Sequence, residues 1–391
     1  MKIFKFFALL ACTSSLSASP FTYVTNLNSN NVSVVDSATN TVTAVIPVGT
    51  NPDGAAITPN LSFVYITNKG SANVSVINTS TNTVVATIPV GSNPERLGIT
   101  PNGSFVYVAN VGTNNVSVIS TATNTVTATV PAGSGARGVA ITPNGSFAYI
   151  TNNGSNTVSV INTSTNTVIA TVAGVGVGPF GIAITPNGQF AYITDFGGNM
   201  VAVISTATNT VTGTINVGNN PADIAITPNG QFAYVVNFGS NSVSVINTSL
   251  NTVTGTITAG IGTSPNGIAI TADGLTAYVA NNGSNSVSVV STASNTVTGT
   301  ITAGIGTTPV YVAARPLPPA PTTMSLAIAQ QQVVANQVQL SSQINNIANS
   351  LALGTPTGVT TAIPAGTTSS ITGPGIYTGI PTVRMGPLGC R

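Results

Sequence analysis

The side chains that could carry out acid–base or metal chemistry are few in this sequence. The chain has no histidine, which excludes a histidine general base, a haem held by histidine and a zinc site that contains histidine. Once an N-terminal signal is removed, the single lysine is Lys69. The acidic residues are Asp36, Asp53, Glu95, Asp195, Asp223 and Asp273. No two of them form a recognisable catalytic motif, so we predict no catalytic residue, no metal site and no cofactor.

A repeated unit carries these residues and must position them. A tyrosine opens a short segment such as YVTN or YITD at intervals of 42 to 44 residues, at Tyr23, Tyr65, Tyr107, Tyr149, Tyr192, Tyr234 and Tyr278. After each tyrosine come close copies of NVSVVDSATN, of TVTAVIPVG and of PDGAAITPN. Periods of about 40 to 45 residues with four strands each are typical of propeller blades. The intervening Pro, Asn, Gly and Asp residues supply the turns.

The number of strands predicts a closed ring. With the strands of a blade named A to D from the axis outward, seven B–C–D units begin at the tyrosines. The A strands begin near Gly54, Leu97, Gly138, Gly181, Asp223 and Gly267, and the last is VYVAA, residues 310–314. An unpaired final strand would recruit other chains through its free backbone groups. We therefore predict an all-β fold, a closed seven-bladed β-propeller over residues 19–316, whose last strand pairs with residues 21–26 and completes the first blade.

The repeat resembles the YVTN family of β-propeller repeat proteins. The resemblance covers residues 21–315 and is carried by motifs such as VSVINTSTNTV and ITPNG, which recur with few changes. It implies a propeller fold and export to the periplasm or the cell surface. Propellers of this architecture include lactonase-like and quinoprotein-dehydrogenase-like enzymes as well as binding proteins, and the fold alone does not choose among them.

Most of the rare charges fall on one face of the predicted disc. The D–A and B–C connections lie on one face of a propeller, and the A–B and C–D connections lie on the other. Of nine charged residues between Tyr23 and Ala314, all but Asp36 and Asp273 fall on the first face, together with several aromatic residues. Aromatic residues mixed with a few charges are typical of a recognition surface. The candidate binding residues are Asp53, Lys69, Glu95, Arg96, Arg137, Phe180, Asp195, Phe196, Asp223, Phe238 and Tyr311.

Corresponding positions of the D–A loops should ring the mouth of the central channel. They hold Asp53, Glu95, Arg137, Phe180, Ala222, Asn266 and Val310, so one side is charged and the other is more apolar. Such a ring could bind an asymmetric ligand. We expect Asp53, Glu95 and Asp223 to be spread around it, exposed and solvated, whereas a close cluster of the three would favour an enzyme. The alternative is that loop tips simply tolerate charge, with Phe196 and Phe238 packed between blades.

Both ends of the chain predict additional segments. Residues 1–18 contain Lys2, Lys5, an apolar run and small residues, a pattern typical of a secretory signal. Residues 9–12 also resemble a lipoprotein box, which makes Cys12 an alternative lipidation site. At the other end, the sequence predicts a Pro-rich linker over residues 317–322 and an amphipathic helix over residues 323–353. Residues 354–391 are rich in Gly, Thr and Pro and predict a flexible tail.

Charge and hydropathy limit the partners. Loss of Lys2 and Lys5 reduces the eight basic residues to six, equal to the six acidic residues, and a neutral chain argues against nucleic acid. No apolar run of the mature chain reaches the ~18 residues of a transmembrane helix. The helix over residues 323–353 could pack on the propeller or form a homo-oligomer, and Cys390 could pair between chains.

The sequence thus predicts an exported, non-catalytic binding or scaffold module, periplasmic, secreted or on the cell surface, that recognises a protein or a glycan. One alternative is an enzyme of the lactonase-like or quinoprotein-dehydrogenase-like type with its site at the channel mouth. The other is a structural envelope protein that assembles through its C-terminal helix.

Overall fold

The computed structural model describes residues 21–314 together with residues 337 and 339. The chain divides into two compact units, Met1–Ala320 and Pro321–Arg391, and the propeller belongs to the first. The predicted signal with Cys12, the linker, the tail with Cys390 and all but two residues of the predicted helix lie outside the described residues. Those two residues, Gln337 and Gln339, are helical. Within the described part of the chain, no helix has the length and apolar character needed to cross a membrane.

The propeller consists of short strands, most of them six residues long. In chain order they are β1 Phe21–Asn26, β2 Asn31–Asp36, β3 Thr41–Pro47, β4 Pro52–Ile57, β5 Phe63–Asn68, β6 Asn73–Asn78, β7 Thr83–Pro89, β8 Pro94–Ile99, β9 Phe105–Asn110, β10 Asn115–Ser120, β11 Thr125–Pro131, β12 Ala136–Ile141, β13 Phe147–Asn152, β14 Thr157–Asn162, β15 Thr167–Val172, β16 Pro179–Ile184, β17 Phe190–Asp195, β18 Met200–Ser205, β19 Thr210–Asn216, β20 Pro221–Ile226, β21 Phe232–Asn237, β22 Ser242–Asn247, β23 Thr252–Ile257, β24 Pro265–Ile270, β25 Thr276–Asn281, β26 Ser286–Ser291, β27 Thr296–Ile301 and β28 Pro309–Ala314.

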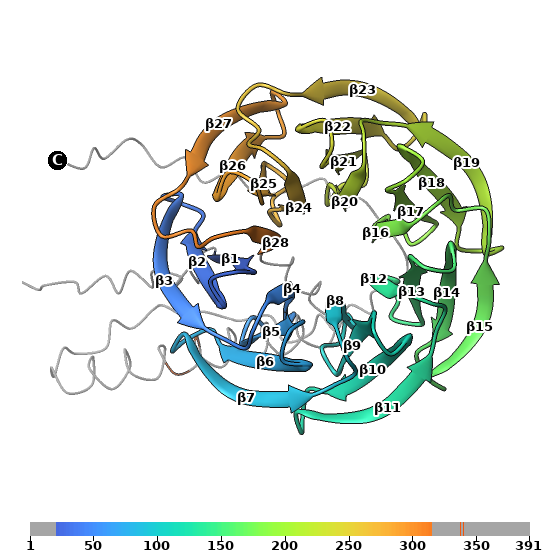
Figure 1. Ribbon diagram of the computed structural model, residues 1–391, viewed down its shortest axis with the longest axis horizontal. Helices are drawn as coiled ribbons and strands as arrows, with labels where there is room; N and C mark the ends of the chain where they lie inside the picture. Colours follow the sequence, from blue (N-terminus) through green and yellow to red (C-terminus); the bar gives the residue numbers. More distant parts are fainter. Residues whose placement is uncertain (1–20, 315–336, 338, 340–391) are drawn as a thin grey trace, which may run out of the picture. The chain divides into compact units, whose positions relative to one another are not determined.

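The strands form seven antiparallel sheets of four, arranged as blades around a central axis (Figure 1). Blade 1 has the order β28-β1-β2-β3, and blades 2 to 7 follow as β4–β7, β8–β11, β12–β15, β16–β19, β20–β23 and β24–β27. Strand β28 pairs with β1, so that Val24 lies opposite Val312 and Tyr23 opposite Ala313. The prediction that the last strand completes the first blade is therefore confirmed, and the ring is closed.

The hydrophobic core lies between neighbouring blades. Each of seven apolar clusters takes its residues from two adjacent blades; one of them joins Tyr23 and Val34 of blade 1 to Val64 and Ile66 of blade 2. The two central strands of each blade are buried on both faces, which explains their nearly continuous Val, Ile and Tyr content. The outermost strands are mostly exposed and carry Thr at alternate positions, which covers each outer edge with polar groups.

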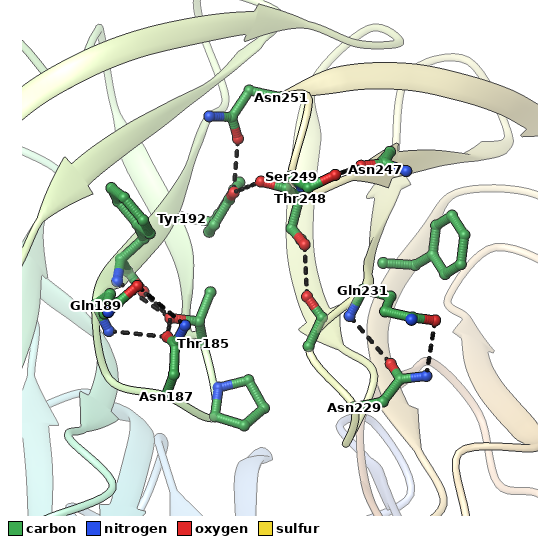
Figure 2. A pocket seen from close by; sticks show the side chains of 14 residues that line it. Thr185, Asn187, Gln189, Tyr192, Asn229, Gln231, Asn247, Thr248, Ser249 and Asn251 are labelled. Atoms are coloured by element: carbon green, nitrogen blue, oxygen red, sulfur yellow. Dashed lines mark hydrogen bonds between the residues drawn. The ribbon is translucent and has the colours of Figure 1, made fainter.

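A tyrosine–asparagine contact joins successive blades. The last Asn of the turn between the third and fourth strands adopts a left-handed conformation in every blade, for example Asn124 with φ of 53°. Its side-chain oxygen accepts a hydrogen bond from the buried tyrosine of the preceding blade, at 2.7 Å for Tyr65 and Asn124 and 2.6 Å for Tyr192 and Asn251 (Figure 2). The bond is present at six of the seven junctions.

The seventh junction, between blades 1 and 2, lacks this bond. The hydroxyl of Tyr23 and the side-chain oxygen of Asn82 occupy the equivalent positions, and neither has a hydrogen-bond partner within the described part of the chain. A buried hydroxyl without a partner contributes no stabilising hydrogen bond and bears a desolvation cost.

Replacing Tyr65 by Phe should therefore destabilise the propeller by about 1 kcal/mol, because it removes a buried hydrogen bond and leaves the oxygen of Asn124 without a donor. The matched control is Tyr23→Phe, which removes a hydroxyl with no hydrogen-bond partner among the residues that the structure describes and should leave the stability unchanged or slightly increased. Urea unfolding followed by circular dichroism measures both. Equal losses for the two variants would show that the Tyr–Asn bond does not stabilise the junctions.

Candidate functional site

The innermost strands present the candidate residues at the channel mouth. Each of these strands, β28, β4, β8, β12, β16, β20 and β24, contains one more residue than its partner near its N-terminal end. In β4, for example, Pro52 pairs with Asn68 and Ala55 with Ile66, so that Asp53 and Gly54 together oppose one residue. Such bulges redirect side chains, and here they occur where the charged residues are. We call the side with these strand starts and the second-to-third-strand turns the mouth face, and the opposite side the turn face.

The third residue of each inner strand is glycine in four blades and a residue with a longer side chain in the other three. These residues are Gly54, Arg96, Gly138, Gly181, Asp223, Gly267 and Tyr311. A Cβ on Gly138 would lie 2.4 Å from the carbonyl oxygen of Phe180 in the next blade, and a Cβ on Gly54 equally close to that of Glu95. Neighbouring inner strands therefore pack backbone against backbone at the glycines. The other three positions carry polar side chains, those of Arg96, Asp223 and Tyr311.

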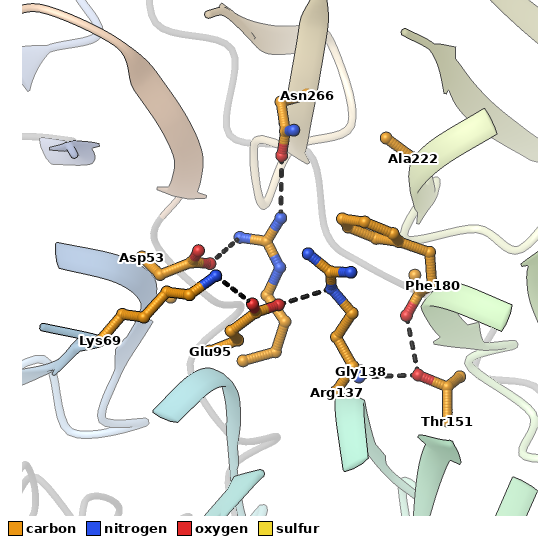
Figure 3. A network of polar contacts seen from close by, with 12 residues as sticks. Asp53, Lys69, Glu95, Arg137, Gly138, Thr151, Phe180, Ala222 and Asn266 are labelled. Carbon is orange, nitrogen blue, oxygen red and sulfur yellow. Dashed lines mark hydrogen bonds and ion pairs between the residues drawn. The ribbon is translucent and has the colours of Figure 1, made fainter. Parts of the chain in front are cut away.

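Glu95 is the centre of an ion-pair network contributed by three blades. Its Oε1 lies 2.5 Å from Nζ of Lys69 in blade 2, and its Oε2 lies 2.5 Å from Nε of Arg137 in blade 4 (Figure 3). Glu95 is almost fully buried, Lys69 is partly exposed, and Arg137 is half-buried. The Arg137 guanidinium also lies 3.5 Å from the centre of the Phe180 ring, a cation–π contact. One carboxylate thus holds two cations.

Arg96 makes the second part of the network and reaches three other blades. Its Nη1 lies 3.1 Å from Oδ1 of Asp53, and its Nη2 donates a hydrogen bond of 3.1 Å to Oδ1 of Asn266. The guanidinium lies over the ring of Tyr311, 4.1 Å from its centre. The side chain is buried, yet its Nε has no partner within the described part of the chain. Burial lowers the pKa of Arg96, but Asp53 and Asp223 outweigh this effect and raise the pKa above its ordinary value.

Asp223 is a buried acid of the channel mouth whose pKa is raised toward neutrality. Burial raises its pKa to about 6, although Arg96 and the backbone N–H groups of Ile268 and Ile224 oppose the increase. The N–H of Ile268 donates to Oδ2 over 3.2 Å. A carboxylic acid with this pKa changes charge within the physiological pH range.

Asp223 should make the propeller less stable as pH rises. The unfolded aspartate titrates near 3.9, so between about pH 4 and pH 6 the folded state holds a proton that the unfolded state releases. This contribution is fully present below pH 4 and is lost by about pH 6 to 7, a decrease of about 2–3 kcal/mol. The variant Asp223→Asn, which can still accept from Ile268, should lack the decrease. Urea unfolding at a series of pH values tests this, and parallel curves for both proteins would contradict it.

Aromatic side chains form the apolar side of the mouth face. The rings of Phe180 and Phe196 stack with centres 5.6 Å apart, and Phe238 follows at 6.2 Å from Phe196. Phe180 is buried, whereas Phe196 and Phe238 remain half-buried. Val177, 62% exposed, lies beside them in the loop before β16, where its carbonyl oxygen accepts from the N–H of Gly197. These side chains form an apolar patch next to the charged network.

The expectation that the acids are exposed and solvated is wrong. Asp53, Glu95 and Asp223 are all buried, as is Arg96. Asp53 and Glu95 belong to the two ion-pair groups of the channel mouth, whereas Asp223 accepts a hydrogen bond from the N–H of Ile268. The physical reason is that these residues lie within the inner strands instead of the loops before them, and the glycine packing brings those strands close together. Glu95 pairs with Lys69 and Arg137, and Asp53 pairs with Arg96, so each of these two acids is in contact with a cation.

Asp195 has a structural role in the loops. It is buried at the end of β17, where the other six blades have Asn, and its Oδ1 accepts from the N–H groups of Val177 and Gly198 at 2.7 and 2.9 Å.

Of the two charged residues assigned to the opposite face, Asp36 ends β2 and accepts from the N–H of Ala38 in the next turn, and Asp273 lies in the turn before β25. Both positions agree with the prediction.

Sequence reasoning did not find a set of clefts on the turn face. These clefts are lined by uncharged turn residues, and their signal in the sequence is a pair of glutamines, Gln189 and Gln231, where blades 2, 3 and 4 have Ser. As for metals, no group of three His, Cys, Asp or Glu side chains in the described residues is placed to hold an ion.

Fold and site together define a seven-bladed β-propeller with an ion-pair network at the mouth of its channel. The sequence matches the family model described as "Lactonase, 7-bladed beta-propeller" over residues 17–127 and 97–313, and the chain belongs to that family. No curated protein matches the chain.

Several solved structures share the fold. A functionally unknown protein from Desulfotomaculum acetoxidans is 24% identical, with 76% of this chain and 99% of that chain covered and a TM-score of 0.69. Hydrazine synthase from Kuenenia stuttgartiensis is 23% identical over 69% of this chain and 92% of its own, with a TM-score of 0.64. A putative 6-phosphogluconolactonase from Bacteroides uniformis is 18% identical over 75% and 99%, with a TM-score of 0.63. These similarities concern the fold alone.

Proposed function

We propose that the protein is a non-catalytic binding module that recognises a partner protein through the mouth face. The observation that carries the proposal is the half-buried pair Phe196 and Phe238, which continues the ring stack from Phe180, the ring in contact with Arg137 of the ion-pair network. An apolar patch with a polar rim is typical of a protein interaction site. In this proposal the module works outside the cytoplasm, because residues 1–18 have the pattern of a secretory signal.

The network would contribute orientation more than attraction. Its carboxylates and cations neutralise one another, so a partner meets no large net charge at the mouth. Lys69 keeps 38% of its side chain exposed while bound to Glu95, and it can still donate to a carbonyl or carboxylate of the partner. Phe196 and Phe238 supply the buried area that binding needs.

The repeat offers a variant that tests this site without damage to the fold. Phe196 and Phe238 occupy a turn position that holds Asn153 in blade 4 and Asn282 in blade 7. The double variant Phe196→Asn and Phe238→Asn should therefore fold, which thermal unfolding by circular dichroism checks. Purified protein is used to capture partners from envelope extract, with mass spectrometry for identification, and is applied in parallel to a glycan array.

The proposal expects a protein that the wild type retains and the double variant loses. If the variant captures the same proteins, the mouth face is not the binding site. If it loses a glycan instead, the partner class is a carbohydrate and the protein partner is rejected.

A second candidate function is lactone hydrolysis, favoured by the raised pKa of Asp223 beside Arg96. A carboxylate with a pKa of about 6 can take a proton from water as the water attacks a lactone carbonyl, and a guanidinium can stabilise the resulting oxyanion. The tetrahedral intermediate then collapses, the bond between the acyl carbon and the ring oxygen breaks, and Asp223 returns its proton to that oxygen, which gives the hydroxy acid. Hydrolysis of glucono-δ-lactone above the spontaneous rate, lost in Asp223→Asn, would support this candidate; no excess rate for the wild type would eliminate it.

A further inference from the structure

Three clefts lined by equivalent turns lie on the turn face, each between two adjacent blades. They are about 640 Å³ between blades 5 and 6, about 480 Å³ between blades 4 and 5, and about 360 Å³ between blades 3 and 4. Each is formed by the Thr-Pro-Asn turn before the second strand of one blade and by two turns of the next blade. All three volumes fall in the range of small-molecule sites, about 300–1,000 Å³.

The cleft between blades 5 and 6 differs from the others through two glutamines. Gln189 and Gln231 stand where blades 2, 3 and 4 have Ser and where blade 7 has Leu275. Both are exposed, and both line the cleft (Figure 2). The largest cleft of the three is therefore the one to which two extra primary amides have been added.

Internal hydrogen bonds fix which groups of this cleft remain free to donate. Oε1 of Gln189 accepts from Asn187, and Oε1 of Gln231 accepts from Asn229, at 3.2 and 3.1 Å. The oxygen of Asn251 accepts from the hydroxyl of Tyr192. The nitrogens of Gln189, Gln231 and Asn251 donate no hydrogen bond to the described part of the chain, so each is a free donor whose amide is oriented by the bond to its oxygen.

The hydroxyl groups of the same cleft remain free to accept a hydrogen bond. Thr248 donates to the carbonyl oxygen of Gly230 at 2.5 Å, and Ser249 donates to the oxygen of Asn247 at 2.7 Å. Each hydroxyl has used its one hydrogen and keeps its oxygen as an acceptor. The cleft thus offers both donors and acceptors to a ligand.

The lining carries no charge and includes three apolar rings. The half-buried rings of Phe190 and Phe232 and the ring of Pro186 line the cleft. Its one titratable residue is Tyr192, whose pKa burial raises to about 12, so it stays neutral. With no cation or carboxylate in the lining, an ionic ligand would lose its hydration without gaining a counter-charge.

We propose that the cleft between blades 5 and 6 binds a neutral saccharide. Sugar hydroxyls both donate and accept, which matches the fixed amide nitrogens and hydroxyl oxygens, and the C–H faces of a sugar ring can pack on Phe190, Phe232 or Pro186. A peptide that binds by strand addition or as a helix fits less well, because turns form this cleft and offer neither a free strand edge nor a helix groove. The site is on the face opposite the proposed protein-binding site and does not depend on it.

The repeat supplies a test variant with a known precedent in the same chain. Gln189→Ser and Gln231→Ser together restore the residue found in blades 2, 3 and 4, so the protein should fold with unchanged thermal stability. Binding of methyl mannoside, lactose and chitobiose is measured by NMR titration up to about 10 mM, with glucuronic acid as the charged comparison. At least one neutral sugar should bind to the wild type, and the double variant should bind it about tenfold or more weakly.

Two further variants separate this site from the mouth face. Phe196→Asn with Phe238→Asn should leave the sugar affinity unchanged. Ser104→Gln with Ser146→Gln adds the amides to the turns beside the cleft between blades 3 and 4 and should raise the number of bound sugars. The proposal fails if no neutral sugar binds, if only glucuronic acid binds, or if the loss of both glutamines leaves the affinity unchanged.

Discussion

Glu95→Gln should destabilise the propeller by about 3 kcal/mol. The substitution keeps the shape of a buried side chain but removes the negative charge between Lys69 and Arg137. Removal of one partner from a buried ion pair typically costs about 3–5 kcal/mol, because the remaining charge is left uncompensated. We place the cost at the lower end since Lys69 is 38% exposed and water can solvate it. The free energy of unfolding in urea measures the effect.

A matched control for this variant is Asp36→Asn. Asp36 accepts a hydrogen bond from the N–H of Ala38 in a turn, and the equivalent residue in blade 2 is Asn78, which makes the same contact with Ser80. Its replacement should change stability by less than about 0.5 kcal/mol. The double variant Glu95→Gln with Arg137→Gln should cost less than the sum of its single variants, because the two residues interact directly. A cost below about 1 kcal/mol for Glu95→Gln would show that the network does not stabilise the fold.

Removal of the closing strand should have a still larger effect. A chain that ends at Thr308 lacks β28, which buries Val310 and Val312 and pairs with β1. Burial of one valine is worth about 1.5–3 kcal/mol, and the loss also leaves β1 with a free edge. Because a typical domain is stable by only about 5–15 kcal/mol, we expect a loss of at least about 5 kcal/mol and a chain that unfolds without cooperativity or aggregates.

The comparison chain for this experiment ends at Ala320 and keeps all the strands of the ring. Urea unfolding and size-exclusion chromatography of the two chains give the answer directly. If the chain ending at Thr308 unfolds at the same urea concentration as the longer one, blade 1 does not depend on β28, and the ring is stable without closure.

The sequence was sufficient for the architecture because the repeat shows every strand seven times. The blades follow from the tyrosine spacing and the turn residues. The closure of the ring follows from the unpaired strand at residues 310–314, and the pairing of β28 with β1 confirms it. The inner strands, however, begin at Pro52 and its equivalents, two or three residues before most of the predicted starts. Alternation of residue types cannot reveal a bulge, which adds one residue and shifts the pattern.

The site could be predicted only as a set of positions. Lys69, Glu95 and Arg137 belong to three blades, and their contacts depend on the distance between neighbouring inner strands. That distance is set by backbone packing at glycines such as Gly138, which no periodicity in the sequence expresses. The burial of Asp53, Glu95 and Asp223 follows from the same packing. The face was therefore predicted, but the solvation of its charges was not.

We expect the ring to open first at the junction between blades 1 and 2, where the hydrogen bond between Tyr23 and Asn82 is missing. A propeller of identical blades could open at any junction with equal probability. Here one junction is weaker, and it belongs to the blade assembled from both ends of the ring. Partial opening should begin there, so amide hydrogens of β1 and β28 should exchange with deuterium before those of the equivalent strands in the other blades. Proteases should find their first cleavage sites in the same blade.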